Sequence, residues 1–102
     1  MQGQFEVDPG ELVAAAGRLA ELAARVSAQS AAVRGSGASA AGAAGNPVAA
    51  GAINAVAASW GDALQQISAA LERDASSLRQ VAQRYVEADE AGAATAQRGL
   101  GR

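Results

Sequence analysis

The feature that most constrains this chain is a long alternation of three- and four-residue spacings between apolar positions in its second half. The repeat runs without a break, and its members, of which only Asp74 is charged, are Ala57, Trp60, Leu64, Ile67, Leu71, Asp74, Leu78, Val81, Tyr85 and Ala88. Such a repeat lies along one stripe of an α-helix and is typical of helices that pack against another helix. Asn46 is suited to cap the start of this helix, and Pro47 is suited to its first position. We therefore predict a helix over about 47–91.

A first helix is predicted upstream, over about 8–34. Asp8 is a strong N-cap, Pro9 suits the first helical position and Glu11 has the capping-box spacing. The larger apolar residues of this segment again recur every seven positions, with one more between them: Leu12, Leu19, Val26, Val33 and Leu22. Residues 35–45 are only Gly, Ala and Ser, without periodicity, so 35–46 is predicted to be the loop.

Two long helices joined by one loop are expected to fold back on each other. We predict an all-α, coiled-coil-like antiparallel hairpin over residues 1–92, with the two apolar stripes facing each other and a flexible C-terminal tail over 93–102. Most of the apolar residues are alanine, which buries little area. We therefore expect a weakly stable hairpin that assembles further, for example into a four-helix-bundle dimer.

The composition argues against several kinds of site. The chain has no Cys and no His, which removes thiol nucleophiles, imidazole bases, disulfides and most zinc sites. Glu87, Asp89 and Glu90 are interpreted as a solvated acidic helix end and not as an acid–base pair. The glycines lack the Lys and the preceding strand of a phosphate-binding loop. We expect no enzyme activity, no cofactor, no metal ion and no small-molecule substrate.

Charge and hydropathy bear on macromolecular partners. All eight basic residues are Arg, scattered singly in a chain of net charge −2, so nucleic acid is not an expected partner. No stretch of about 20 residues is apolar enough to span a bilayer, and lipid-surface binding is disfavoured because the faces are rich in alanine and lack Lys. The first eight residues have neither a positive start nor an apolar run, so no general secretory signal peptide is expected.

The aromatic residues of the repeat allow two interpretations. Trp60 and Tyr85 can fill the core of the hairpin, or they can anchor a partner protein, since Trp and Tyr dominate interface hot spots. The same two roles, hairpin core or partner binding, are open for the neighbouring positions Gly61, Leu64, Ile67, Leu71, Leu78 and Val81.

Two short stretches carry a family resemblance. Residues 85–91, Tyr-Val-Glu-Ala-Asp-Glu-Ala, resemble the Tyr-x-x-x-Asp/Glu secretion motif of type VII (ESX) substrates, with Tyr85 and Asp89 as the matching residues. One helical turn separates them, so both side chains can present on one face. Together with the opening Phe5-x-Val7-Asp8-Pro9-x-x-Leu12, they resemble the EspC-like type VII secretion targets, which are related to the WXG (ESAT-like) helical hairpins. WXG proteins carry Trp-x-Gly, whereas Gly61 directly follows Trp60 here, so the resemblance favours the EspC-like branch.

The resemblance implies a function as well as a fold. It implies an actinobacterial type VII secretion substrate or co-secreted partner, cytoplasmic before export and then secreted or at the cell surface, without a cleavable signal peptide. The implied partners are the motor ATPase of the ESX apparatus, which would recognise Tyr85 and Asp89, and a second helical hairpin or another copy of the chain. The alternative is an intracellular helical adaptor or oligomerisation scaffold that is not exported.

Overall fold

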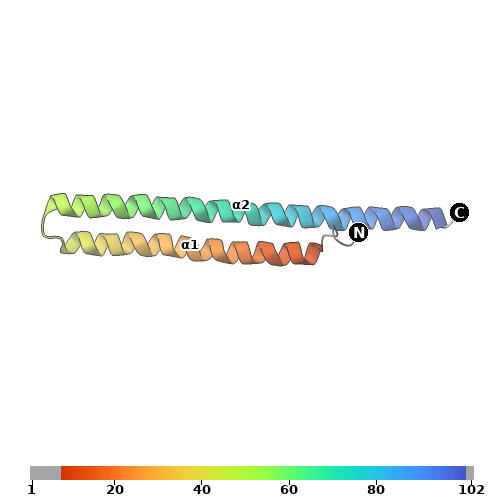
Figure 1. The fold of residues 1–102 in the computed structure, drawn as a ribbon, viewed down its shortest axis with the longest axis horizontal. Helices are drawn as coiled ribbons and strands as arrows, with labels where there is room; N and C mark the ends of the chain where they lie inside the picture. Colours follow the sequence, from red (N-terminus) through yellow and green to blue (C-terminus); the bar gives the residue numbers. More distant parts are fainter. Residues whose placement is uncertain (1–7, 101–102) are drawn as a thin grey trace, which may run out of the picture.

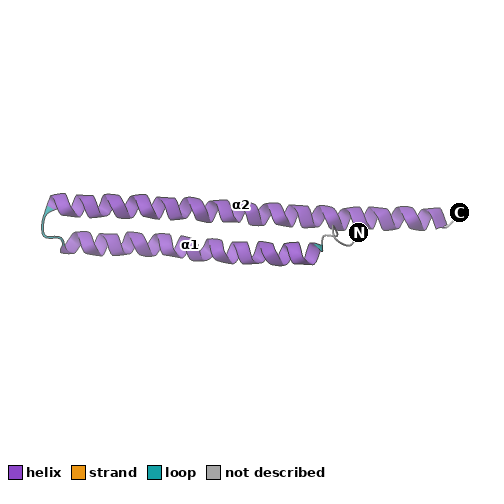
Figure 2. Cartoon of the chain, viewed as in Figure 1, coloured by secondary structure: helices purple, strands orange, loops and turns teal. Residues whose placement is uncertain are grey.

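The computed structural model describes residues 8–100, which form a long two-helix hairpin (Figure 1). Helix α1 spans Pro9–Ala43 and helix α2 spans Pro47–Leu100, and the two run antiparallel. Helix covers nearly all of the described chain and no described residue is in a strand (Figure 2), so the predicted all-α hairpin is confirmed. The hairpin is a thin rod with extents of 85 × 23 × 14 Å.

Both helices begin at the predicted caps. The Oδ1 atom of Asp8, whose backbone is extended, accepts a hydrogen bond of 2.9 Å from the N–H of Gly10. At the start of α2, Oδ1 of Asn46 accepts one of 2.8 Å from the N–H of Ala49. The first turn of a helix leaves its N–H groups without intrahelical partners, and each cap satisfies one of them.

Helix α1 is longer than predicted. Its predicted end near Arg34, followed by a loop over 35–46, is wrong, because the helix continues to Ala43. Gly37 and Ala41 in the added part are buried against α2. Each glycine in a helix costs about 1 kcal/mol relative to alanine, and this tertiary packing outweighs that cost.

The turn between the helices is consequently short. It comprises residues 44–46, in which Ala44 still has helical angles and its N–H bonds to the carbonyl of Ala41. Gly45 has φ 81°, a left-handed conformation that glycine adopts without a steric penalty. The chain therefore reverses direction within three residues.

Helix α2 also extends beyond its predicted end near Ala91. It continues to Leu100, so most of the segment 93–102 is helical. Residues 93–98 are good helix formers except Thr95, and Arg98 in the last turn interacts favourably with the negative end of the helix dipole. The predicted stop overestimated the effect of the single Gly92.

The surface at which the helices meet is lined by small side chains. On each helix four of the five buried residues recur every seven positions, and we call these eight residues the small-residue seam: Ala16, Ala23, Ser30 and Gly37 on α1, and Gly61, Ser68, Ala75 and Ala82 on α2. The fifth buried residue of each helix, Ala41 on α1 and Ala57 on α2, lies one turn beyond the series, toward the turn between the helices. The distance between packed helices depends on the side chains at the contact, so this seam brings the two backbones close together. The prediction that the stripes of larger residues face each other is therefore wrong. Small and large residues share the same seven-residue period, and the small ones occupy the centre.

Candidate protein-interaction surface

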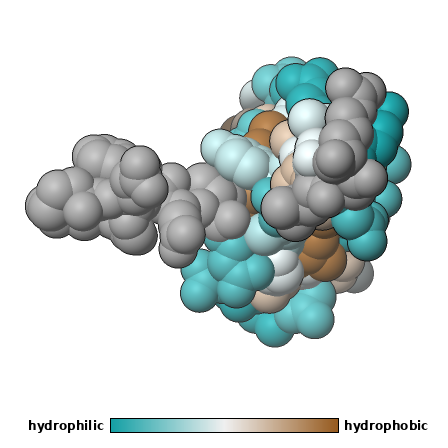
Figure 3. Space-filling model, turned by 90° about the vertical axis from the view of Figure 1, so that its right-hand side faces the viewer, coloured by the Kyte–Doolittle hydropathy of each residue, from teal (hydrophilic) through white to brown (hydrophobic). Residues whose placement is uncertain are grey.

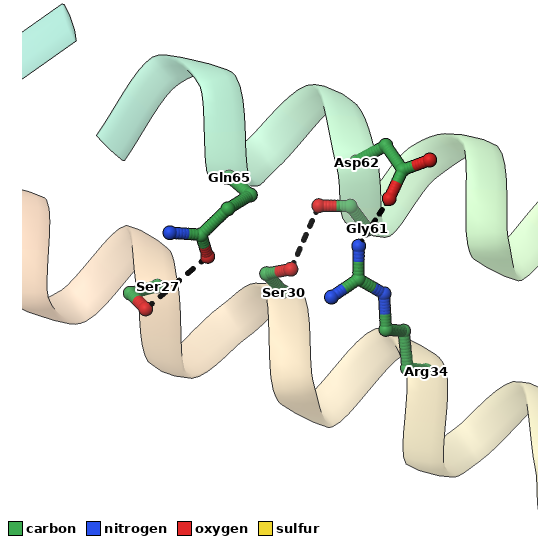
Figure 4. A network of polar contacts seen from close by, with 6 residues as sticks. All are labelled: Ser27, Ser30, Arg34, Gly61, Asp62 and Gln65. Carbon is green, nitrogen blue, oxygen red and sulfur yellow. Dashed lines mark hydrogen bonds and ion pairs between the residues drawn. The ribbon is translucent and has the colours of Figure 1, made fainter. Parts of the chain in front are cut away.

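Two buried serines set the register of the hairpin. The hydroxyl of Ser30 donates a hydrogen bond of 2.7 Å to the carbonyl of Gly61 (Figure 4), and that of Ser68 donates one of 2.7 Å to the carbonyl of Ala23. Both serines are 1% exposed. Every buried side-chain nitrogen or oxygen atom of the described residues has a hydrogen-bond partner. A shift of one helix along the other by less than a heptad would separate these hydroxyls from their acceptors, which is costly in a buried contact.

One side of the seam is polar, and we call it the polar flank. Here the hydroxyl of Ser27 donates to Oε1 of Gln65 at 3.3 Å, and the guanidinium of Arg34 pairs with the carboxylate of Asp62 (Figure 4). The Arg34 side chain crosses over Gly61, where a Cβ atom would lie only 2.6 Å from the Arg34 Nε atom. Gly61 therefore contributes space for this ion pair and an acceptor for Ser30.

The large apolar residues gather on the opposite side, the apolar flank. Ser27 and Gln65 each lie four positions after a seam residue. The large apolar residues each lie three positions after a seam residue, and this difference places them on the other side of the seam. In an antiparallel pair of helices, residues at the same number of positions after a seam residue lie on the same side of the hairpin, whichever helix they belong to. The contact between Ser27 and Gln65 is an example. Half-buried in this flank are Leu19, Val26, Val33, Leu64, Leu71 and Leu78.

A second row on α2 stands further out on the apolar flank. Trp60 is 61% exposed, Ile67 is 50% exposed and Val81 is 36% exposed. Trp60 borders an apolar hollow whose wall includes Val33 and Ile53. These exposed side chains do not fill the core of the hairpin itself, and their role in partner binding stays a prediction. In the space-filling view along the rod (Figure 3), brown apolar residues likewise reach the surface between teal polar ones.

The residues of the secretion motif lie on a projecting part of α2. Helix α2 extends past the start of α1 (Figure 1), and every described side chain from Gln83 to Gly99 is exposed. Tyr85 is 44% exposed, and Asp89 follows it by one helical turn. Among the described residues, none buries these two side chains, and both lie on the same projecting helix. Phe5 and Val7 of the opening motif lie outside the described residues.

The structure also bears on other kinds of site. Within residues 8–100, no three His, Cys, Asp or Glu side chains gather in a way that could hold a metal ion. Neither helix has, in its described part, a segment long and apolar enough to cross a membrane. Sequence reasoning missed the seam residues Ser30, Gly37 and Ser68, although their seven-residue spacing from neighbouring alanines was a signal for them.

Comparison with known proteins identifies a family. The family model WXG100, described as proteins of 100 residues with WXG, matches residues 4–90. Neither the curated proteins nor the solved structures include a significant match. In this chain Trp60 and Gly61 lie within α2, and the turn between the helices is at residues 44–46. The tryptophan is therefore part of a helix and not of the turn.

Proposed function

Because the chain belongs to the WXG100 family, we propose that it is a type VII secretion substrate or a co-secreted partner that acts by binding other proteins and not by catalysis. The WXG100 family is associated with type VII secretion substrates. The observation that carries the proposal is the exposed pair Tyr85 and Asp89, one turn apart on the projecting end of α2. A receptor can contact both side chains without disturbing the packing of the two helices.

The finer parts of the proposal follow from the two sequence stretches. We assign the chain to the EspC-like branch on the residues around Asp8 and Tyr85, and we propose export through the ESX apparatus of an actinobacterium to the outside or the cell surface. The motor ATPase of that apparatus would bind the motif end of α2. The other partner would be a helical hairpin that covers the apolar flank, whose exposed Trp60 has the chemistry of an interface anchor.

An export assay tests the motif. Y85A and D89A are expressed in an actinobacterial strain with an active type VII system, and the protein in the medium and in the cells is measured by immunoblot. Loss of one hot-spot contact of about 1.4 kcal/mol weakens binding about tenfold, so we expect export to fall roughly tenfold while the cellular amount stays constant. Unchanged export of both variants would remove the role that we give to these side chains.

Two controls separate recognition from folding and from the alternative function. E87A alters an exposed carboxylate of the same projecting segment on a different face, and we expect normal export. Circular dichroism of each purified variant should show the helix content of the wild type. Wild-type protein that stays inside cells exporting other type VII substrates would favour the intracellular adaptor instead.

A further inference from the structure

We propose that the groove between the start of α1 and the projecting end of α2 is the docking site of residues 1–7 of the same chain, which lie outside the described residues. Phe5 of this segment packs against Val13 and Val86. The docked segment lies away from the apolar flank and needs neither export nor a second hairpin, so this proposal goes beyond the proposed function. A segment that does not dock would overturn it and leave the proposed function untouched.

The groove is open and has a volume of about 800 Å³. Val13 of α1 and Val86 of α2 line it together with the buried Ala82, and both valines are exposed in the described structure. Filling the groove with apolar groups would remove these side chains from water, which is favourable. The other lining residues are Pro9, Gly10, Arg79, Gln83, Glu87 and Glu90.

The groove lies on the polar flank of the hairpin. The contact between Ser27 and Gln65 defines that flank. Val13 lies two heptads before Ser27 on α1, and Arg79 lies two heptads after Gln65 on α2. Val86 follows Arg79 by one more heptad and is therefore on the same side of α2. A partner that covers the apolar flank would leave this groove open.

The groove extends past the start of α1. The register set by the hydrogen bond from Ser68 to Ala23, continued by two heptads, places Pro9 level with Ala82. Val86 lies one turn further along α2, where no described segment runs beside that helix (Figure 1). Whatever fills this part of the groove must come from outside the described residues.

Residues 1–7 are joined to the chain at this place and have the required length. Asp8, which is level with Gln83, has an extended backbone with φ −89° and ψ 112°. An extended chain advances about 3.3 Å per residue and a helix about 1.5 Å. The step from Asp8 back to Phe5 therefore spans about 10 Å, which is the length of α2 from Gln83 to Glu90 at the far end of the groove. A segment tethered so closely has an effective concentration in the millimolar range.

The segment also carries a matching apolar pattern. Phe5 and Val7 are separated by Glu6 and flanked by Gln4 and Asp8. Successive side chains of an extended chain point to opposite sides, so Phe5 and Val7 share one side. With that side on the groove, Glu6 points to solvent. The reverse orientation would set Glu6 against the two glutamates that line the groove, and like charges repel.

A cysteine cross-link tests where the segment lies. The chain has no Cys, and Gly3 is on the same side of an extended segment as Phe5. Ala94 lies one turn beyond the groove residue Glu90, whereas Ala96 lies on the opposite side of α2, and both alanines are exposed. Under mild oxidation, G3C with A94C should form a disulfide within one chain at least about tenfold faster than the matched control, G3C with A96C.

Two further variants test the anchor. Added to the G3C and A94C pair, F5A should slow the cross-link to the rate of the control, whereas E6A should leave the rate unchanged, because that side chain points to solvent. The linked protein should run as a monomer on a non-reducing gel. Trypsin cleaves after Arg18 and Arg84, so mass spectrometry of the joined peptides identifies the bond.

Hydrogen exchange measures docking without introduced cysteines. A docked segment protects the backbone amides of residues 83–90, so F5A should speed their exchange at least about threefold, and E6A should not. Circular dichroism confirms that each variant keeps the helix content of the wild type. Equal cross-linking rates for the two cysteine pairs, a disulfide that joins two chains, or exchange at 83–90 that F5A does not change would each overturn the proposal.

Discussion

The close contact of the two helices can be tested with two glycines of α1 that lie two residues apart. A Cβ atom on Gly37 would lie 2.2 Å from the Cβ atom of Ala57, whereas a Cβ atom on Gly35 would have no neighbour within 4 Å. Both glycines are inside the helix. Replacing each by alanine therefore changes the helix propensity equally and differs only in the contact with α2.

The expected magnitudes follow from this geometry. Alanine is favoured over glycine in a helix interior by about 1 kcal/mol, so G35A should raise the free energy of unfolding by about that amount. In G37A the new methyl group must move by at least about 1 Å relative to Ala57 to reach an ordinary contact distance. Overpacking of this kind costs about 1–3 kcal/mol. G37A should therefore be about 1–3 kcal/mol less stable than G35A.

Thermal unfolding followed by circular dichroism at 222 nm measures the difference. For a domain of this size, 1 kcal/mol shifts the Tm by about 4–8 °C, so G37A should melt at least about 4 °C below G35A. All samples must have the same protein concentration, because any self-association stabilises the folded chain by mass action.

A double variant supplies the control. In an A57G background the methyl group of residue 57 is gone, and the remaining neighbours of a Cβ at Gly37 lie at 3.7 and 4.0 Å, ordinary contact distances. G37A should then stabilise as G35A does. If G37A stabilises the wild-type background as much as G35A does, the helices are not as close as the seam requires, and the reasoning fails.

Two further predictions concern the polar contacts between the helices. S30A removes the buried hydrogen bond to Gly61 and should lower the free energy of unfolding in urea by about 1 kcal/mol, whereas S27A, at a less buried contact, should change it by less than about 0.5 kcal/mol; equal effects would contradict the role of the seam hydroxyl. D62N removes the ion pair with Arg34, in which the two side chains are 44% and 68% exposed. It should lower the free energy of unfolding by less than about 1 kcal/mol, and this difference should vanish in about 1 M NaCl. A loss of stability that persists in salt would contradict this.

The sequence predicted the fold where local chemistry determines it. Asp8 and Asn46 mark the helix starts because their side chains bond to N–H groups within three residues, a contact that can be recognised without tertiary structure. The helix ends were wrong because they depend on packing. Nothing local distinguishes Gly37, which is buried against α2, from Gly35, which is exposed, so the propensity of the whole segment indicated a loop.

The sequence located the candidate site only in part. Periodicity identified Trp60, Ile67 and Val81 as members of one stripe, and they share a side of α2 in the structure. Periodicity did not show which stripe of α2 faces α1, because the small residues Ser68 and Ala75 repeat with the same seven-residue period as the large ones. Size decides between two stripes of equal period: the smaller residues allow the closer approach of the helices, and the larger ones are left at the side.

This choice links the stability of the hairpin to its binding surface. Because the small-residue seam holds the backbones close together, a side chain as large as that of Trp60 or Ile67 cannot fit between them and remains available to a partner. The buried hydroxyls of Ser30 and Ser68 then fix the height of every residue on the apolar flank. The serines of the seam therefore help to determine which exposed residues of α1 and α2 lie side by side on the apolar flank, although they are themselves buried.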